Sequence, residues 1–153
     1  EKHKGKVLLV DYWATWCPTC VENLPHIVQL HNEHSDDGLA VISISMDDPE
    51  EEAAVREELA KLSPGFEHLL SKFGSSDDSV AAFDYDGGVP LYKLFDHEGN
   101  LRYQFSDFPE QLEKGEPVEN LDKRVEELLA ELPEQESSTE ELPAEDLPAN
   151  YAN

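Results

Sequence analysis

The apolar residues of this chain follow strand-like and helix-like patterns in alternating segments. Residues 7–14, VLLVDYWA, form a continuous β-favouring run, which is typical of a strand buried on both faces of a mostly parallel sheet. Residues 39–46, LAVISISM, alternate apolar residues with two serines and predict a second strand. Residues 89–96 and 101–106 flank the turn sequence HEGN and predict a β-hairpin.

Apolar residues at helical spacing lie between and after these strands. A first helix is predicted from the cysteine pair at residues 17–20 onward. The sequence DDPEE at residues 47–51 predicts the start of a second helix, with Asp48 as a side-chain cap and Pro49 in the first turn. Residues 119–132 carry one apolar stripe and predict a last, amphipathic helix.

Two segments have less regular patterns. Residues 66–73 are interpreted as a further short helix, and residues 107–117 as an acidic linker. The resulting order of elements is β-α-β-α-(α)-β-β-α. A parallel β-α-β unit that leads into an antiparallel hairpin predicts an α/β fold in three layers, with a central mixed sheet and helices on both faces.

The composition predicts one domain and a tail. Residues 1–133 are long enough to form a single domain with a hydrophobic core. Residues 134–153 carry six acidic residues and no basic residue, so we expect them to form an acidic disordered tail. Because the chain does not begin with Met, we expect it to be an excised or processed piece, without any targeting segment.

The negative charge of the chain argues against two classes of binding partner. Its 35 acidic and 11 basic residues give a net charge of −24. Such a surface is repelled by nucleic acid and by anionic lipid, so neither is expected to bind. No apolar run is long enough to span a membrane, and a tether outside this piece stays open.

Cys17 and Cys20 are the two cysteines of the chain, and three uses are open to them. As a structural disulfide they would contribute little to the stability of the fold, because closing so short a loop removes little entropy from the unfolded chain. As part of a structural zinc site they would need about four ligands, and the sequence offers no second pair at ligand spacing. A reversible dithiol is therefore the favoured interpretation.

The position of Cys17 at the start of a predicted helix gives it a chemical role. A helix N-terminus presents free backbone N–H groups and a partial positive charge, which stabilise a thiolate. We therefore expect Cys17 to be the exposed nucleophile. Pro18 suits the first helical turn, and Cys20 lies one turn further on, close enough to resolve a mixed disulfide.

These residues carry a family resemblance. VDYWATWCPTC followed by VENLP resembles the thioredoxin-fold thiol–disulfide oxidoreductases, and most of all the bacterial extracytoplasmic group typified by TlpA and ResA. Pro25, five residues after Cys20, belongs to that pattern, and Gly88-Val89-Pro90 matches the cis-proline loop of the fold. The resemblance covers residues 6 to about 105, and the last predicted helix fits the C-terminal helix of the fold. It implies a thioredoxin-like three-layer sandwich.

The resemblance also implies a reaction and its setting. Cys17 would attack a substrate disulfide and Cys20 would release it, with no cofactor beyond the redox-active Cys17–Cys20 disulfide. The partners would be protein thiols or disulfides and an upstream electron donor, and the chain would act as a monomer. Reduction is favoured over oxidation by resemblance to the cytochrome c maturation group, with apocytochrome c or another exported protein as substrate. The location would be the periplasm, or a membrane anchor facing it.

Five residues around the cysteines are expected to contact the substrate or to tune the pair. The resemblance implies that Val89 precedes a cis peptide bond at Pro90 and offers its backbone to an extended substrate. Trp16 is expected to flank the nucleophile on the surface. Pro18 and Thr19, between the cysteines, are expected to tune the reduction potential.

Asp11 interrupts an otherwise apolar strand six residues before Cys17. Burial of a lone carboxylate is unfavourable and raises its pKa. The functional interpretation is a general base for Cys20, as at the matching place in thioredoxin, and the alternative is a strand-end residue bonded to solvent or backbone. The lysine that pairs with this aspartate in thioredoxin has no clear equivalent, and Ser43 lies near its place.

Two other functions stay open. A copper-binding chaperone of the same fold would pair both cysteines with a distant histidine, for which His68 and His97 are candidates, although such proteins usually space the thiols one residue wider. No metal site is predicted. A redox domain used as a docking module of a larger protein is the second alternative, because relatives usually carry a strand or hairpin before residue 6.

Overall fold

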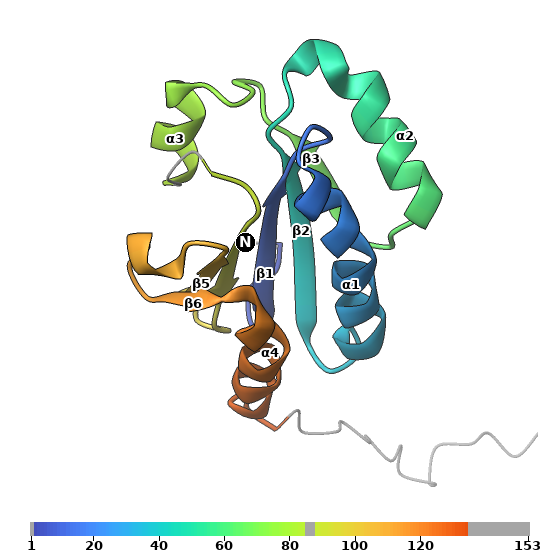
Figure 1. The fold of residues 1–153 in the computed structure, drawn as a ribbon. Helices are drawn as coiled ribbons and strands as arrows, with labels where there is room; N and C mark the ends of the chain where they lie inside the picture. The colour runs from blue at the N-terminus through green and yellow to red at the C-terminus, as the bar shows by residue number, and fades with distance from the viewer. Residues whose placement is uncertain (1, 85–87, 135–153) are drawn as a thin grey trace, which may run out of the picture.

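The computed structural model describes residues 2–84 and 88–134 of the chain. Within them, one six-stranded sheet has the order β3-β2-β1-β4-β5-β6 (Figure 1). β1 is parallel to β2, and β4 runs antiparallel to both β1 and β5, so the sheet is mixed as expected. The strands are β1 (Val7–Trp13), β2 (Leu39–Ser45), β3 (Glu67–Leu70), β4 (Leu91–Phe95), β5 (Leu101–Ser106) and β6 (Gly115–Pro117).

Helices cover both faces of this sheet, which confirms the predicted fold class. The helices are α1 (Pro18–His34), α2 (Glu52–Leu62), α3 (Asp77–Phe83) and α4 (Leu121–Ala130). α1 and α4 bury their apolar stripes in one core cluster against the sheet, and α2 packs beside α1 (Figure 1). α3 packs on the opposite face, where Val80 and Phe83 contact residues of β1 and β2.

The first β-α-β unit decides where the site is built. Val7 on β1 pairs with Leu39 on β2, and the parallel register continues to Trp13 and Ser45. The carboxyl ends of both strands therefore lie at the same end of the sheet. The turn that follows β1 leads into α1 at that end, and the residues that follow β2 lie next to it.

The prediction of a helix at residues 66–73 is wrong. Residues Glu67–Leu70 form β3, which pairs in parallel with β2 and occupies the edge of the sheet. A short apolar run has too few residues for its period to separate a strand from a helix, and pairing with the free edge of β2 decides between them here. β3 thus forms one edge of the sheet, next to β2.

The acidic linker expected at residues 107–117 is also partly structured. It contains a 3₁₀ turn at Pro109–Gln111 and the short strand β6, which is parallel to β5. A Cβ atom on Gly115 would lie 1.9 Å from the carbonyl oxygen of Pro109, so only glycine fits where this strand begins. The sequence of this segment is rich in acidic residues and gives no sign of the close contact between Gly115 and Pro109 or of the pairing with β5.

The start of the second helix differs in detail from the prediction. Asp48 lies at the N-cap position, but its side chain makes no capping hydrogen bond. Pro49–Glu51 form a 3₁₀ turn, and α2 proper begins at Glu52.

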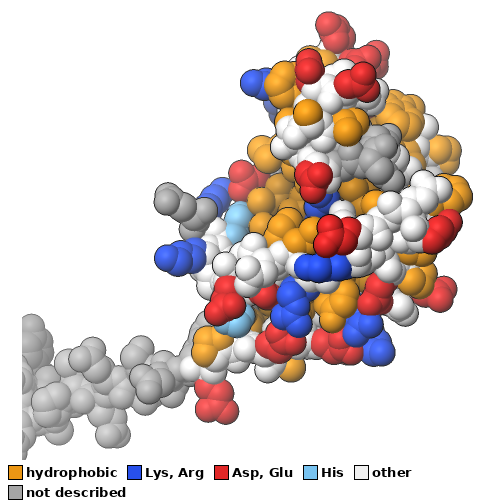
Figure 2. All heavy atoms as spheres, turned by 90° about the vertical axis from the view of Figure 1, so that its left-hand side faces the viewer, with side chains coloured by type: hydrophobic (Ala, Val, Ile, Leu, Met, Phe, Trp, Pro, Cys, Tyr) orange, Lys and Arg blue, Asp and Glu red, His pale blue; other side chains and the backbone are white. Residues whose placement is uncertain are grey.

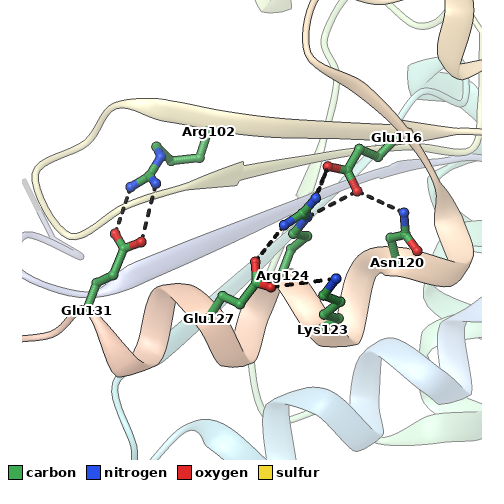
Figure 3. A network of polar contacts seen from close by, with 7 residues as sticks. All are labelled: Arg102, Glu116, Asn120, Lys123, Arg124, Glu127 and Glu131. Carbon is green, nitrogen blue, oxygen red and sulfur yellow. Dashed lines mark hydrogen bonds and ion pairs between the residues drawn. The ribbon is translucent and has the colours of Figure 1, made fainter.

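A polar network holds α4 against the edge of the sheet formed by β6 (Figure 3). Arg124 on α4 donates to both carboxylate oxygens of Glu116 on β6, at distances of 2.6–3.1 Å. The same guanidinium donates to Glu127, and Asn120 donates a further hydrogen bond to Glu116. Bidentate pairing of this kind fixes the orientation of the helix as well as its distance.

The outer surface of the molecule is acidic, as the net charge requires. Figure 2 shows acidic side chains spread around the face on the left of Figure 1, with hydrophobic side chains across its middle. No helix among residues 2–84 and 88–134 is long and apolar enough to cross a bilayer. The predicted tail, residues 134–153, lies outside the described residues except for its first residue.

Candidate active site at the start of helix α1

The two cysteines lie where β1 turns into α1. Cys17 is the N-cap residue of the helix, with extended backbone angles, and Pro18 is the first helical residue. Proline is favoured there because its missing N–H would have no partner in the helix. The first turn carries no acidic residue, so nothing in it opposes the positive end of the helix dipole.

Cys17 and Cys20 are joined by a disulfide, with their Cα atoms 5.3 Å apart. Sγ of Cys17 accepts a hydrogen bond from the backbone N–H of Cys20 at 3.2 Å. The expectation that Cys17 is exposed needs correction, because the residue is only 7% exposed in this disulfide form. It is still slightly more accessible than Cys20, which is 2% exposed.

The loop before β4 lies beside the sulfur of Cys17. The peptide bond between Val89 and Pro90 is cis, which confirms that expectation. The carbonyl oxygen of Val89 lies 3.7 Å from Sγ of Cys17, and the Val89 side chain packs against the cluster that holds both cysteines. The backbone of this loop therefore lies beside the sulfur that a substrate would contact.

The other predicted contact residues surround the disulfide. Pro18 and Thr19 are exposed between the cysteines. Trp16 keeps 57% of its surface exposed immediately before Cys17, whereas Trp13 is fully buried. A large exposed aromatic ring beside a reactive sulfur can contact a protein partner, while Trp13 supports the turn from within.

Asp11 is buried in the middle of β1, two residues before Trp13 and on the same face of the sheet. Burial raises the pKa of its carboxyl from the ordinary value of 3.8 to about 8. One of its oxygens, Oδ1, has no hydrogen-bond partner among the described residues. The acid therefore keeps its proton near neutrality and is available for proton transfer.

Tyr92 and Asn23 were not singled out from the sequence. Tyr92 on β4 pairs in register with Asp11 and is 1% exposed. Burial and the nearby charge of Asp11 raise the pKa of the Tyr92 phenol above its ordinary range, and a side-chain hydrogen bond with Asn23 opposes them. Asn23 lies on α1 three residues after Cys20, so Tyr92 links β4 to the first turns of the helix.

Asp47 was read in the sequence only as part of the start of a helix. It is fully buried after the end of β2 and accepts hydrogen bonds from Thr15, in the turn before Cys17. The sequence signal that could have located it is an acid directly after a strand that runs parallel to the strand bearing the site.

The histidines do not gather around the cysteines. His26 contacts Asp122 on α4 at 2.6 Å, and Nδ1 of His68 contacts Oγ of Ser43 at 2.6 Å. His97 lies in the turn between β4 and β5, at the end of the sheet opposite the disulfide. In the described part of the chain, no group of three His, Cys, Asp or Glu side chains is arranged to hold a metal ion.

A groove of about 720 Å³ also lies far from the disulfide. It is found at the opposite end of the sheet, where the start of β1 meets the end of β4, and its lining includes Leu8, Ile42, Phe95 and the lysines at positions 2, 4 and 6. Thiol–disulfide exchange needs an accessible sulfur and a surface to hold the substrate chain, not an enclosing cavity. We therefore place the site at the disulfide and not in the groove.

The fold and this site define a class. A parallel β-α-β unit, a hairpin entered through a cis X-Pro bond, and a Cys-x-x-Cys disulfide at a helix N-terminus are the parts of a thioredoxin-fold thiol–disulfide oxidoreductase. The chain belongs to the redoxin family, whose model matches residues 1–123.

Individual relatives agree with this assignment. Thioredoxin-like protein YneN of Bacillus subtilis is 34% identical over 101 residues, covering 65% of this chain and 55% of that protein. Thiol-disulfide oxidoreductase ResA of Halalkalibacterium halodurans is 32% identical over 47 residues, covering 31% of this chain and 27% of that protein. The chain thus spans between about a quarter and a little over half the length of these two relatives.

Solved structures are similar in fold. A putative thiol:disulfide interchange protein DsbE from Chlorobium tepidum superposes with a TM-score of 0.64 at 20% identity, covering 86% of this chain and 84% of that one. A secreted Mycobacterium tuberculosis disulfide oxidoreductase gives a TM-score of 0.60 at 18% identity, covering 83% and 85% of the two chains. At these identities the likeness concerns the fold alone.

Proposed function

We propose that the chain exchanges its Cys17–Cys20 pair with protein disulfides, acting as a reductase. The Cys17 thiolate attacks one sulfur of a substrate disulfide, forms a mixed disulfide and releases the other substrate sulfur as a thiolate that takes up a proton. Cys20, as a thiolate, then attacks Sγ of Cys17. This step releases the second substrate thiol and leaves the Cys17–Cys20 disulfide, so two electrons pass to the substrate.

The observation that carries the proposal is the environment of the Cys17 sulfur. It lies at the N-cap of α1 and accepts a hydrogen bond from the N–H of Cys20. A hydrogen bond and a helix N-terminus both favour the thiolate over the thiol. The carbonyl of Val89 borders the same sulfur, and Trp16 is exposed next to Cys17 in the chain. We propose that Val89 and Trp16 hold an extended segment of the substrate, with Pro90, Pro18 and Thr19 shaping the site.

Asp11 is the proposed base for the second step. With a pKa of about 8, its carboxylate and its acid form are both populated near neutral pH. We propose that it accepts the proton of Cys20 as that thiol becomes the attacking thiolate.

The direction and the setting rest on the relatives. Reductase action follows the resemblance to the cytochrome c maturation group, with an exported protein as substrate and a separate donor that restores the dithiol. A location outside the cytoplasm follows the resemblance of the cysteine motif to the extracytoplasmic group typified by TlpA and ResA. Residues 1–133 as the redox domain and residues 134–153 as an acidic tail complete the proposal.

Reduction of insulin by the reduced chain tests the activity. We expect turnover with dithiothreitol as donor, loss of turnover in Cys17→Ser, and a trapped mixed disulfide in Cys20→Ser. A midpoint potential well below that of the glutathione pool supports a reductase, and a high potential supports an oxidant. An inactive chain with an intact fold would instead favour the docking-module alternative.

Metal titration tests the copper-binding alternative. Tight copper binding that needs both cysteines and a histidine, in a chain without reductase activity, would replace the proposal. His68→Ala and His97→Ala separate the two candidate ligands named from the sequence.

A further inference from the structure

Asp47 is a buried carboxylate that the proposed reaction does not use. It follows β2 and is 0% exposed. Its oxygens accept hydrogen bonds from the backbone N–H of Thr15 at 2.9 and 3.2 Å, from the hydroxyl of Thr15 at 2.5 Å and from the hydroxyl of Ser45 at 2.6 Å. Every partner donates, so both oxygens of Asp47 act as acceptors.

Burial of a carboxylate is unfavourable unless hydrogen bonds or an opposite charge compensate for its lost solvation. Charge-assisted hydrogen bonds are the stronger kind, and three of the four here go to a single residue of the turn. Asp47 therefore holds Thr15 against the end of β2. The strand ends are also joined by the backbone, where the N–H of Met46 donates to the carbonyl of Trp13 at 2.8 Å.

Thr15 is two residues before the reactive sulfur. The turn closes when the N–H of Cys17 donates to the carbonyl of Ala14 at 3.1 Å, which places Thr15 between the two bonded residues. Holding Thr15 thus fixes the path of the chain into the N-cap of α1. The orientation of Sγ toward the N–H of Cys20 depends on that path.

We propose that Asp47 is a positioning residue for Cys17, acting through Thr15. Its carboxylate keeps the turn in the conformation in which the helix N-terminus stabilises the Cys17 thiolate. This inference rests on the proposed exchange reaction. It names a residue that positions Cys17 for the first step, the attack on the substrate disulfide. The negative charge of Asp47 by itself would have the opposite effect, because a nearby anion disfavours a second one.

The two effects predict opposite signs, which makes the inference testable. If positioning dominates, Asp47→Asn weakens the hold on Thr15 and raises the pKa of the Cys17 thiol. A rise of about one unit lowers the thiolate fraction, and with it the alkylation rate below that pKa, about tenfold. The midpoint potential then becomes more negative, because the reduced form loses its thiolate stabilisation.

The experiment follows iodoacetamide alkylation of Cys17 from pH 4 to 9, in a Cys20→Ser background that leaves one thiol. Asp47→Asn and Thr15→Val are compared with Thr15→Ser, which keeps the hydroxyl and should restore the parent profile. Asp96→Asn is the matched control. Asp96 is also a buried acceptor of backbone N–H groups, but it lies at the far end of β4.

The proposal expects slower alkylation near pH 6 in Asp47→Asn and, to a smaller extent, in Thr15→Val, with no change in Asp96→Asn. A lower thiol pKa in Asp47→Asn would mean that its charge alone acts, and an unchanged profile with a lower melting temperature would mean a merely structural role. Either result overturns the proposal.

The test does not depend on one variant or on a substrate. If Asp47→Asn does not fold, Thr15→Val carries the test. The alkylation rate needs no disulfide substrate, so it stays informative even if the chain reduces no protein.

Discussion

Asp11 on β1 lies directly opposite Ser43 on β2 in the parallel register, and the hydroxyl of Ser43 contacts Nδ1 of His68 at 2.6 Å. Ser43 lies near the place of the lysine that pairs with the matching aspartate in thioredoxin, and its hydroxyl is directed to His68 on β3. The carboxyl of Asp11 is therefore buried with an oxygen that has no partner among the described residues. This arrangement explains why burial alone raises the pKa of Asp11 to about 8.

Asp11→Asn should change how stability depends on pH. An unfolded chain releases the Asp11 proton near its ordinary pKa of 3.8, whereas the folded chain keeps it until about pH 8. The folded state therefore binds more protons between these values, and the free energy of unfolding falls as pH rises through that window. The shift from 3.8 to about 8 is about 4 pKa units, so at about 1.4 kcal/mol per unit the variant should be more stable than the parent by about 5 kcal/mol at pH 8 and nearly equal to it at pH 4.

Urea unfolding of the reduced proteins between pH 4 and pH 8 measures this difference. Asp96→Asn is a useful comparison, because burial raises the pKa of Asp96 but hydrogen bonds from Asn100 and Glu98 outweigh it and lower the pKa overall. Asp96→Asn should therefore destabilise the chain most above pH 4. This effect of pH on stability is opposite in sign to that of Asp11→Asn. Parallel pH profiles for the parent and Asp11→Asn would show that Asp11 is already ionised in the folded protein.

Asp11→Asn should also slow the resolving step and leave the first step unchanged. Without a base, Cys20 must lose its proton to water, so resolution of a mixed disulfide should slow by about 10²-fold near pH 7 and recover at high pH. Stopped-flow release of a fluorescent thiol from the mixed disulfide measures the step. The alkylation rate of Cys17 is the internal control, and a loss in that rate would mean that Asp11 acts on the nucleophile itself.

The sequence predicted the layers of the fold and the chemistry of the pair because both depend on local signals. The continuous run at β1, the alternation at β2, and the cysteines at a helix start each lie within a few consecutive residues. β3 and β6 could not be predicted in the same way. Each is short, and each exists because a neighbouring strand offers it free hydrogen-bonding groups.

The same distinction holds at the site. Cys17, Trp16 and Pro90 belong to recognisable motifs, whereas Asp47 and Tyr92 enter the site from strands far along the chain. An acid after a strand is equally consistent with a helix cap, and a tyrosine in a strand is equally consistent with ordinary core. Their importance follows from the register that brings their strands against β1.

Lys93→Met should destabilise the chain through α3. Lys93 is 3% exposed on β4, and its ammonium donates to the carbonyls of Phe83 and Asp84 at the C-terminal end of α3. Methionine fills a similar volume but leaves those carbonyls without this donor, so the free energy of unfolding should fall by about 2–3 kcal/mol. Hydrogen exchange should become faster in residues 77–84.

Lys123→Met is the control for this change, since Lys123 is exposed on α4 and should be replaced without measurable loss. If Lys93→Met were as stable as the parent, methionine packing would compensate for the lost hydrogen bonds, and Lys93 would not hold α3 in place.

Trp16→Ala should separate protein substrates from small ones. The ring is 57% exposed beside Cys17 and contributes little to the core, so its removal should leave the melting temperature nearly unchanged. If it contacts the substrate chain, kcat/KM for insulin should fall about tenfold, a typical loss for an exposed aromatic contact at a protein interface. Reaction with a small aromatic disulfide should change less than twofold, because such a reagent needs only the sulfur.

Two control variants test this prediction. Trp16→Phe should recover most of the activity. Leu69→Ala, which trims another exposed apolar side chain at the β3 edge, should have none of these effects. Equal losses with both substrates would show that Trp16 tunes the thiol of Cys17 and does not bind protein.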